Sequence, residues 1–458
     1  MAQTQFHLQS GVRFPAFPIE QQASVLAQWI GCQRFIYNGK VDEDRLFAAQ
    51  RSMMLRDGVT ECATPLDQRY AQFRTELSPW LAEVPSQILR NGAMRWRTAK
   101  QRQLQGLARA PRRRNRTNFN SVMLTSELFE FRPDVVAVTG EPVCRLFLGT
   151  KSRPLGELKF KAHRPFGVPK AITIRRESDN RWYVRFSYEH ASAEIIRTPA
   201  ELAYELNGLS DEELELASLG ADRNVRDNCA ATSDGAFFSV PAVVKERLNR
   251  KANGRKRYQR KLARQQKGSS NRAKTVARLA RSHAYQRNAL KNVAHKTSYA
   301  LAASDAKLLV FEDLKVANMV RAPKARQDAS GRWLPNGRRQ EAGLNKAILQ
   351  SAWGRTLEFT QYKAQRRNKL VLAVPPHHTS QECSHCGRTH PENRQGNRFL
   401  CDVCGFSAHA DTNAACTILR RGIKLLRLGV PEKKSTKRVS FRKNSSRAGP
   451  SDVSVERV

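Results

Sequence analysis

Four of the nine cysteines form two closely spaced pairs that could together hold a metal ion. Cys383 and Cys386 make one Cys-x2-Cys pair, and Cys401 and Cys404 make a second one after fourteen intervening residues. Each such pair turns two sulfurs toward one ion, and two pairs complete a tetrahedron. A glycine directly follows each pair, and glycine is favoured in the tight turn of a metal knuckle. Two Cys-x2-Cys pairs that arose by chance would not need these glycines. The spacing predicts a closed, structural Zn²⁺ site, because four thiolates leave no open position for catalysis.

Three carboxylates stand at the ends of predicted elements, where acids from distant segments can converge. Asp222 ends an apolar run, Glu312 follows the apolar run 308–311, and Asp411 precedes a helical run. Three acids that meet in space could hold two divalent ions, which activate water and stabilise the leaving oxygen of a phosphodiester. The pattern is therefore typical of a nuclease with two Mg²⁺ ions at its site.

Each acid also has a simpler interpretation on spacing alone. Asp411 could only cap its helix, and Asp222 could be a loop acid. Glu312 competes with its neighbour Asp313, and only position distinguishes the two. The residues by themselves leave these alternatives open.

The charge of the chain indicates a polyanionic partner. Over 458 residues, 80 Lys and Arg against 41 Asp and Glu give a net charge of +39. The cations are spread along the chain rather than gathered in one amphipathic helix, which argues against a membrane-surface protein. No apolar run approaches the roughly 20 residues that cross a bilayer, and the five isolated cysteines fit a reducing compartment. We expect a cytoplasmic protein that binds nucleic acid, with counterion release supplying much of the affinity.

The most basic segment is 245–281, which has 15 Lys and Arg and one acid, Glu246. A solvated helix face is the usual fate of such a run. Here the cations would repel one another without a polyanion, and Tyr258 offers a surface on which a base could stack. The predicted nucleic-acid contacts are Arg255, Lys256, Arg257, Arg260 and Lys261.

Two kinds of pattern position these residues. The first 200 residues begin with helical periodicity and continue with short alternating strands, which predicts helices and then a small β-barrel or sheet. The expected helices are 20–38, 70–81 and 84–107, and the expected strands are 143–148, 158–161, 171–175 and 182–188. The acidic stretch 201–215 is expected to be a linker.

The second half alternates strands with helices, which predicts a mixed α/β sheet. The expected strands are 216–222, 308–311 and 370–374, with a hairpin turning at Asp234-Gly235 between 229–232 and 236–240. The expected helices are the basic segment, broken near Gly268, a helix ending near Ala303, and 344–367. The Lys-, Arg- and Ser-rich tail 432–458 is expected to be disordered.

The acids and cysteines lie in motifs that resemble the TnpB (transposon OrfB) family of RNA-guided nucleases, to which the miniature type V CRISPR effectors are related. Residues 220–228, GADRNVRDN, resemble the first RuvC motif of that family. Residues 311–314, FEDL, resemble the second motif, and 411–415, DTNAA, the third. Residues 379–387 and 401–405 are similar to the family's zinc module, which interrupts the RuvC domain just before its last acid.

The resemblance implies a multidomain α/β and β fold. It assigns an RNase H-like RuvC nuclease domain to 206–376 and 406–428, a zinc-binding ribbon to 377–405, and a basic tail to 429–458. A wedge domain, an oligonucleotide-binding-like β-barrel of 1–22 and 113–205, would be split by a helical recognition domain at 23–112. Guide RNA and target DNA are the implied partners, in the cytoplasm of a prokaryotic cell, and a monomer is favoured.

The first hypothesis is an RNA-guided DNA endonuclease in which Asp222, Glu312 and Asp411 hold two Mg²⁺ ions. The protein would read a short motif beside the target, and guide pairing would read the rest. The second hypothesis is an RNA-guided DNA-binding protein without cleavage, such as a repressor or accessory transposon factor. A self-sufficient transposase is disfavoured, because nothing indicates a catalytic tyrosine or an assembly domain. The chain departs from the family pattern at Asn224 and near Asn368, where glycine is usual, and it lacks a Phe-Lys pair within 109–120.

Overall fold

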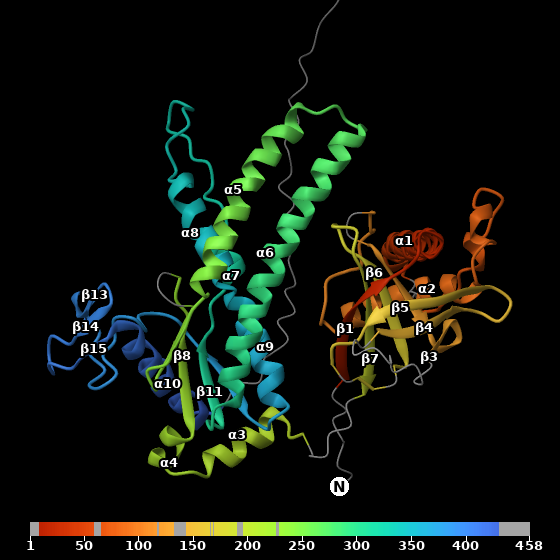
Figure 1. Cartoon of the computed structure of the whole chain (residues 1–458). Helices are drawn as coiled ribbons and strands as arrows, with labels where there is room; N and C mark the ends of the chain where they lie inside the picture. The colour runs from red at the N-terminus through yellow and green to blue at the C-terminus, as the bar shows by residue number, and fades with distance from the viewer. Residues whose placement is uncertain are drawn as a thin grey trace, which may run out of the picture.

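The computed structural model of the chain divides into two bodies (Figure 1). The first contains a large sheet with helices α1 and α2, and the second contains a smaller sheet with helices α3 to α10 and three short strands. The mixed α/β class is confirmed. The residues described are 9–58, 66–116, 119–131, 143–164, 166–167, 169–189, 196–225 and 229–429. Residues 430–458, nearly all of the predicted basic tail, lie outside them.

The first body is built on an antiparallel sheet of order β2-β6-β7-β1-β5-β4-β3. Apolar side chains alternate along its strands and pack on one another, with the rings of Phe14, Phe160 and Phe186 at centroid distances of 5.3 to 5.8 Å. The four strands expected between 143 and 188 are confirmed. The strands are β1 (Gln9–Phe17), β2 (Ser121–Thr125), β3 (Phe129–Phe131), β4 (Val143–Gly149), β5 (Pro154–Lys161), β6 (Ala171–Arg176) and β7 (Trp182–Glu189).

This sheet curls, but in the described part of the chain no ladder closes it into the expected barrel. Its two edge strands, β2 and β3, do not pair with each other there. The chain joins them through the single 3-10 turn η3 (Ser126–Leu128), so the two edges approach at this corner. Because β3 has only three residues, it offers few groups with which to close a barrel.

The helices of the first body differ in part from their prediction. Helix α1 (Glu20–Arg56) starts where expected and runs well past residue 38, and α2 (Ser86–Leu104) is confirmed. The prediction of a helix over 70–81 is wrong. Only two 3-10 turns form there, η1 (Ala71–Phe73) and η2 (Pro79–Leu81). Ser78 Oγ accepts from the Thr75 N–H and donates to the Phe73 carbonyl, which replaces helical bonding.

The second body contains a five-stranded sheet of order β10-β9-β8-β11-β12. Its strands β8, β11 and β12 run parallel and are largely buried, as apolar parallel strands are when both faces are covered. The remaining two form the predicted hairpin. The strands are β8 (Ser218–Asp222), β9 (Ala230–Thr232), β10 (Phe237–Phe238), β11 (Leu308–Glu312) and β12 (Leu370–Val374).

Helix α10 (Ala410–Arg427) crosses this sheet so closely that two glycines are required. A Cβ on Gly220 of β8 would lie 2.1 Å from the Ala415 carbonyl oxygen, and a Cβ on Gly422 of α10 would lie 2.4 Å from a methyl of Val310. The first approach fixes the N-terminal half of α10 against β8, and the second fixes its C-terminal half against β11. The first turn of the helix is therefore held beside the end of that strand.

Two further predictions about the second body need correction. The acidic stretch is not a linker but two helices, α3 (Pro199–Asn207) and α4 (Asp211–Leu216), because capping boxes at Thr198 and Ser210 place acids in the first turns. The helix expected over 344–367 is two helices, α8 (Arg338–Ser351) and α9 (Trp353–Gln365). Ala352, with φ of 59°, separates them.

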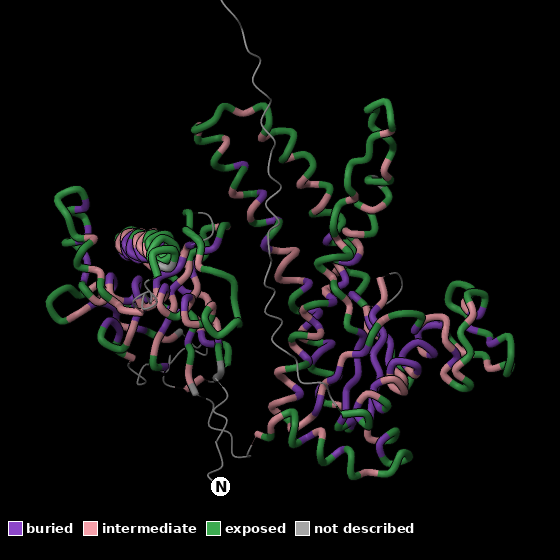
Figure 2. Tube along the Cα trace, turned by 180° about the vertical axis from the view of Figure 1, so that it is seen from behind, coloured by how far each residue is buried: buried purple, intermediate pink, exposed green. Residues whose placement is uncertain are grey.

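Helices α5 (Ala242–Arg264) and α6 (Ser270–Ala303) form a long hairpin that confirms the expected break near Gly268. The hairpin projects from the second body and its tip is exposed (Figure 2). No helix within the described ranges is both long and apolar enough to span a bilayer.

Candidate functional site

The three predicted acids come together at one edge of the second sheet. Asp222 is the last residue of β8 and Glu312 the last residue of β11, and these parallel strands pair in register up to Ala221 and Phe311. Asp411 lies in the first turn of α10, which packs on β8. All three acids are buried, with 8, 5 and 1% of their surfaces exposed.

Burial disfavours ionisation of Asp222 and Glu312. Burial, together with the charges of Glu312 and Asp411, raises the pKa of Asp222 to about 7. Burial also raises the pKa of Glu312, against an opposing hydrogen bond from Thr379. Buried carboxylates that repel one another are stabilised by a cation, and hard oxygen ligands suit Mg²⁺. The donor set therefore fits divalent metal ions.

Asp411 is oriented by two side chains. The Nδ2 of Asn224 donates to Asp411 Oδ2 at 2.6 Å, and Nη2 of Arg394 donates to Oδ1 at 2.8 Å. The N-cap of α10 is His409, whose ring accepts from the Asp411 N–H. The interpretation of Asp411 as a mere helix cap is therefore wrong, because its carboxylate joins the cluster of acids instead.

The structure distinguishes Glu312 from Asp313. Glu312 Oε1 accepts from Thr379 Oγ1 at 2.6 Å, and the buried guanidinium of Arg223 donates to the Glu312 carbonyl. Asp313 is exposed and forms an ion pair with Lys315. Position within the cluster therefore favours Glu312.

The two departures from the family pattern are compatible with this fold. Asn224 does not have a positive φ, so its position does not require glycine, and its carbonyl accepts from Trp353 Nε1 at 2.9 Å. Asn368 has φ of 51° just beyond the end of α9. Asparagine is the residue that best tolerates this left-handed conformation after glycine.

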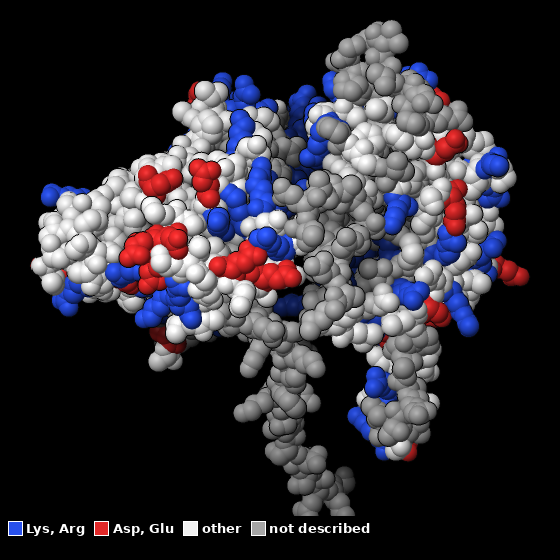
Figure 3. Space-filling view, turned by 90° about the horizontal axis from the view of Figure 1, so that it is seen from below, with Lys and Arg blue, Asp and Glu red and all other residues white. Residues whose placement is uncertain are grey.

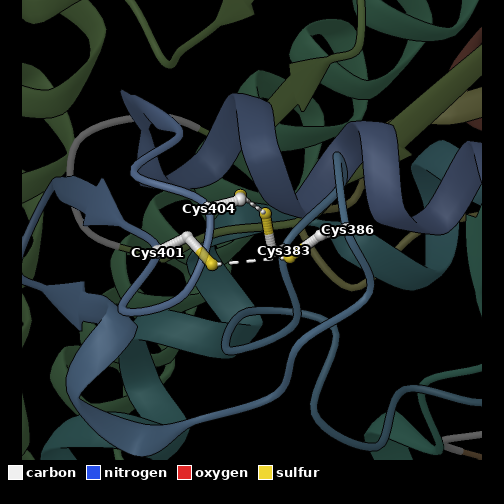
Figure 4. Close-up of side chains that lie close together, drawn as sticks. All are labelled: Cys383, Cys386, Cys401 and Cys404. Atoms are coloured by element: carbon white, nitrogen blue, oxygen red, sulfur yellow. Dashed lines mark hydrogen bonds between the residues drawn. The ribbon is translucent and has the colours of Figure 1, made fainter.

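The four predicted zinc ligands converge in a second centre (Figure 4). Their sulfurs all lie within 4.8 Å of one another, with Cys383 and Cys404 at 3.7 Å and Cys386 and Cys401 at 3.6 Å. This four-cysteine cluster confirms the predicted ligand set and is consistent with structural zinc.

The two knuckles have the same backbone design. Gly387 N–H donates to the Cys383 carbonyl at 2.9 Å, and Gly405 N–H donates to the Cys401 carbonyl at 3.2 Å. The two glycines have φ of 80° and 71°, which explains why a glycine follows each pair. The N–H of Cys404 lowers the pKa of Cys401 to about 7, whereas burial raises the pKa of Cys383 in the metal-free cluster.

The cysteine centre is tied directly to the acids through α10. The side chain of Asn413 accepts from the Ser384 N–H at 2.9 Å and donates to the Glu382 carbonyl at 2.8 Å. Arg394, which holds Asp411, belongs to β13 of the same cysteine-rich segment. The three strands of this segment are β13 (Arg394–Gln395), β14 (Arg398–Leu400) and β15 (Ser407–His409).

The five predicted nucleic-acid residues lie on α5 but do not act alike. Lys256, Arg257, Arg260 and Lys261 are exposed or partly exposed. Arg255 instead donates to the carbonyl and hydroxyl of Ser282 on α6, each at 3.4 Å, and so joins the two helices.

A basic groove of about 1350 Å³ runs along the α5–α6 hairpin and reaches the turn between β6 and β7. Tyr258 lines it, as do two residues of that turn, Asp179 and Arg181. Lys and Arg side chains gather beside the hollow between the two bodies in Figure 3. The groove's cations from the hairpin are Arg247, Arg250, Lys251, Arg278, Arg281 and Lys296.

Sequence reasoning missed the side chains that orient the acids. Arg394, Asn224 and Thr379 come from loops or short strands whose place in space no periodicity reveals. Five of the hairpin's six groove cations were visible only as part of the basic run 245–281, and Lys296 lies beyond it. Which cations of the hairpin line the groove depends on which face of each helix turns toward the first body.

The fold and the acid cluster define a RuvC-like nuclease architecture with an inserted four-cysteine segment. Family models match residues 204–322 ("Probable transposase", OrfB_IS605) and 353–418 ("Cas12f1-like, TNB domain"). "Putative RNA-guided DNA endonuclease InsQ" of Escherichia coli (strain K12) is 31% identical over 354 residues, covering 76% of this chain and 78% of that protein. The chain therefore belongs to the OrfB/TnpB family.

Two further relatives match the chain, and one solved structure shares its fold. A "Putative RNA-guided DNA endonuclease" of Streptomyces pristinaespiralis is 26% identical over 97% of this chain and 95% of that protein. "CRISPR-associated endodeoxyribonuclease Cas12f1" of Sulfoacidibacillus thermotolerans is 45% identical over 58 residues, 12% of this chain and 14% of that protein. The fold also resembles Cas12f1 in a complex with sgRNA and target DNA, with a TM-score of 0.52 and 12% identity over 88% of this chain and 83% of that one.

Proposed function

We propose that this protein is an RNA-guided DNA endonuclease whose active site is formed by Asp222, Glu312 and Asp411. The observation that carries the proposal is the convergence of these three buried acids, from segments far apart in the sequence, at one edge of the RuvC-like sheet. A repressor would have no need to bury three acids whose charges repel one another. The proposal agrees with the names of the relatives.

The residues around the acids have defined tasks in this proposal. Asp222, Glu312 and Asp411 would hold two Mg²⁺ ions, which when bound activate water and stabilise the leaving oxygen. Asn224 and Arg394 hold the Asp411 carboxylate, and Thr379 holds that of Glu312. Such partners fix the direction of the ligand oxygens before any metal arrives. Zn²⁺ bound to the four cysteines would have a structural task only.

Guide RNA and target DNA would lie along the cationic surfaces. The basic groove offers six cations from the hairpin and Arg181, together with Tyr258, a combination that suits phosphates and bases. In the proposed division of labour, a wedge (1–22 and 113–205) and a helical recognition domain (23–112) read a short motif in duplex DNA. RuvC segments (206–376 and 406–428) and the ribbon (377–405) act on the strand to be cut, as a monomer in the cytoplasm of a prokaryotic cell.

The direct test is to sequence the RNA that copurifies with the chain and then assay cleavage in Mg²⁺. We expect an RNA with a structured scaffold and a variable end, and cutting of a duplex that matches the variable end. A duplex with a scrambled target is the control. Guided binding without any cutting would replace the proposal with the alternative, an RNA-guided DNA-binding protein. The absence of a discrete copurifying RNA would reject guidance.

The solvent-facing cations of α5 give a second test. Replacing Lys256, Arg257, Arg260 and Lys261 by Gln should flatten the salt dependence of duplex DNA binding, by up to about 0.9 log units of slope for each phosphate that the variant no longer neutralises. Arg255→Gln is the matched control, since Arg255 holds α6 and its removal should lower stability more than the slope. An unchanged slope in the fourfold variant would make these residues a solvated surface.

A further inference from the structure

A projecting basic arm connects two elements of the candidate active site. The arm, residues 321–337, leaves the short helix α7 (Val316–Met319), which closely follows Glu312. It returns through α8 to Trp353, whose indole N–H donates to the Asn224 carbonyl at 2.9 Å. In Figure 1 the arm extends outward beside α5. The segments that flank the arm in the sequence are therefore anchored at the candidate site.

The arm is an ordered hairpin and not a loose loop. Gln327 and Trp333 are antiparallel partners, and the Leu334 N–H donates to the Arg326 carbonyl at 2.9 Å. Asp328 closes the turn, because its Oδ1 accepts from the N–H groups of Ser330 and Arg332, each at 2.9 Å. These bonds also lower the pKa of the Asp328 carboxyl, so the turn persists at neutral pH.

The hairpin presents its largest apolar side chain to solvent. Trp333 is 65% exposed, whereas four of the other five tryptophans are at most 8% exposed and Trp80 is 41% exposed. Leu334 beside it is 47% exposed. Almost every residue of the arm is exposed (Figure 2). No packing of the arm accounts for a tryptophan at its tip.

The charge of the arm identifies the kind of partner. It carries Arg321, Lys324, Arg326 and Arg332 against one acid, Asp328, which its own turn already uses. A second copy of this chain would bring another +39 and would be repelled. An exposed indole among cations suits an unpaired nucleobase, whose ring stacks while its phosphates meet the cations.

We propose that Trp333 stacks on an unpaired base of the DNA strand that is led to the acids. This inference rests on the proposed function for the identity of the strand. The arm falls between the segments that the two family models match, which end at residue 322 and resume at 353. Nearly all of the arm therefore lies outside both matched segments.

The test measures single-strand binding by tryptophan fluorescence in the full chain. Glu312→Ala protein, which should not cut, is titrated with a 15-nucleotide oligo(dT) at two salt concentrations, because a stacked base quenches an exposed indole. Trp333→Ala should remove most of the quench and weaken binding roughly tenfold, as the removal of one stacking platform does. Trp333→Phe should keep most of the affinity while losing the quench. Tyr204→Ala, which removes another aromatic that is 84% exposed, is the matched control.

Salt dependence separates the stacking ring from the cations. Trp333→Ala should leave the salt slope unchanged, and Arg326→Gln with Arg332→Gln should reduce it by about 0.7 log units for each single-strand phosphate that is no longer neutralised. Equal affinity of Trp333→Ala and its parent overturns the inference. So does Trp333-dependent binding of a blunt duplex of the same length, or a fall in sedimentation mass on Trp333→Ala, which would assign the arm to self-association. The assay requires neither guide RNA nor cleavage. Base stacking on Trp333 can therefore be detected even if the protein does not cleave DNA, so failure of this inference is distinguishable from failure of the proposed function.

Discussion

The molecule contains a cluster of four cysteines and a cluster of three acids that are built in opposite ways. The cysteine centre takes all its ligands from residues 383–404, and its two knuckles repeat one backbone pattern. The acid centre takes Asp222, Glu312 and Asp411 from three elements that only the assembled sheet brings together. The first centre therefore stabilises its segment locally, whereas the second depends on the fold and is destabilised by burial of its own charges.

The two centres are nevertheless connected. Asn413 of α10 bonds the first cysteine knuckle, and Arg394 from the cysteine-rich segment holds Asp411. Loss of the thiolates should therefore also displace the acids, because α10 and Arg394 would lose the contacts that position them. Damage to the acids should not reach the thiolates.

The largest expected effect is loss of cleavage without loss of fold. Glu312→Ala should lower the rate of guided DNA cleavage by at least about a hundredfold, because removing even a partner of a ligand costs 10- to 100-fold. Zinc content and guide binding should stay at the wild-type level. Asp313→Ala is the control, since Asp313 is exposed and paired with Lys315. If the control loses activity and Glu312→Ala does not, the assignment passes to Asp313.

Breaking the cysteine centre should reverse this pattern. Cys383→Ser should lower zinc content, measured by atomic emission, and open the segment 377–411 to proteolysis, because metal bonding replaces a core that so short a segment lacks. Cleavage should then fall as a consequence. Cys144→Ser, a half-buried thiol of the first body, is the control. Fully active protein without zinc would contradict the structural role.

The acid centre should have a pH signature that its ionisation predicts. The pKa of Asp222 is raised from 3.8 to about 7, so the folded, metal-free protein binds the extra proton between these values. This contribution to stability is therefore lost as pH rises from about 4 to 7. Asp222→Asn should raise the free energy of unfolding of Mg²⁺-free protein at pH 8 by an amount of the order of a few kcal/mol, and should have little effect near pH 4. The measurement is denaturant unfolding at the two pH values. Equal stabilisation at both pH values would contradict the burial of a charge.

Much of both centres could be predicted from the sequence, for different reasons. The thiolate spacing fixes its own geometry, and apolar runs mark β8 and β11, whose last residues are the acids. Two predictions were wrong because side chains bond to the backbone. Ser78 bonds to the backbone where a helix was expected over 70–81. Capping boxes at Thr198 and Ser210 start helices in the stretch that was expected to be a linker. Arg394 could not be found, because only tertiary packing brings the ribbon to Asp411.

The smallest expected effect concerns Asn224, where the family usually has glycine. Its amide donates to Asp411 Oδ2, while Arg394 independently holds Oδ1. Asn224→Gly should therefore raise the Mg²⁺ concentration for half-maximal cleavage by up to about tenfold, the lower end for a partner of a ligand, with nearly full rate at saturating Mg²⁺. Asn224→Asp should instead lower it, because a fourth carboxylate facing Asp411 would add negative charge that a bound cation relieves. The measurement is the cleavage rate as a function of Mg²⁺ concentration. If the glycine variant reaches half-maximal cleavage at a lower Mg²⁺ concentration than the wild type, Asn224 hinders metal binding and does not orient Asp411 for it.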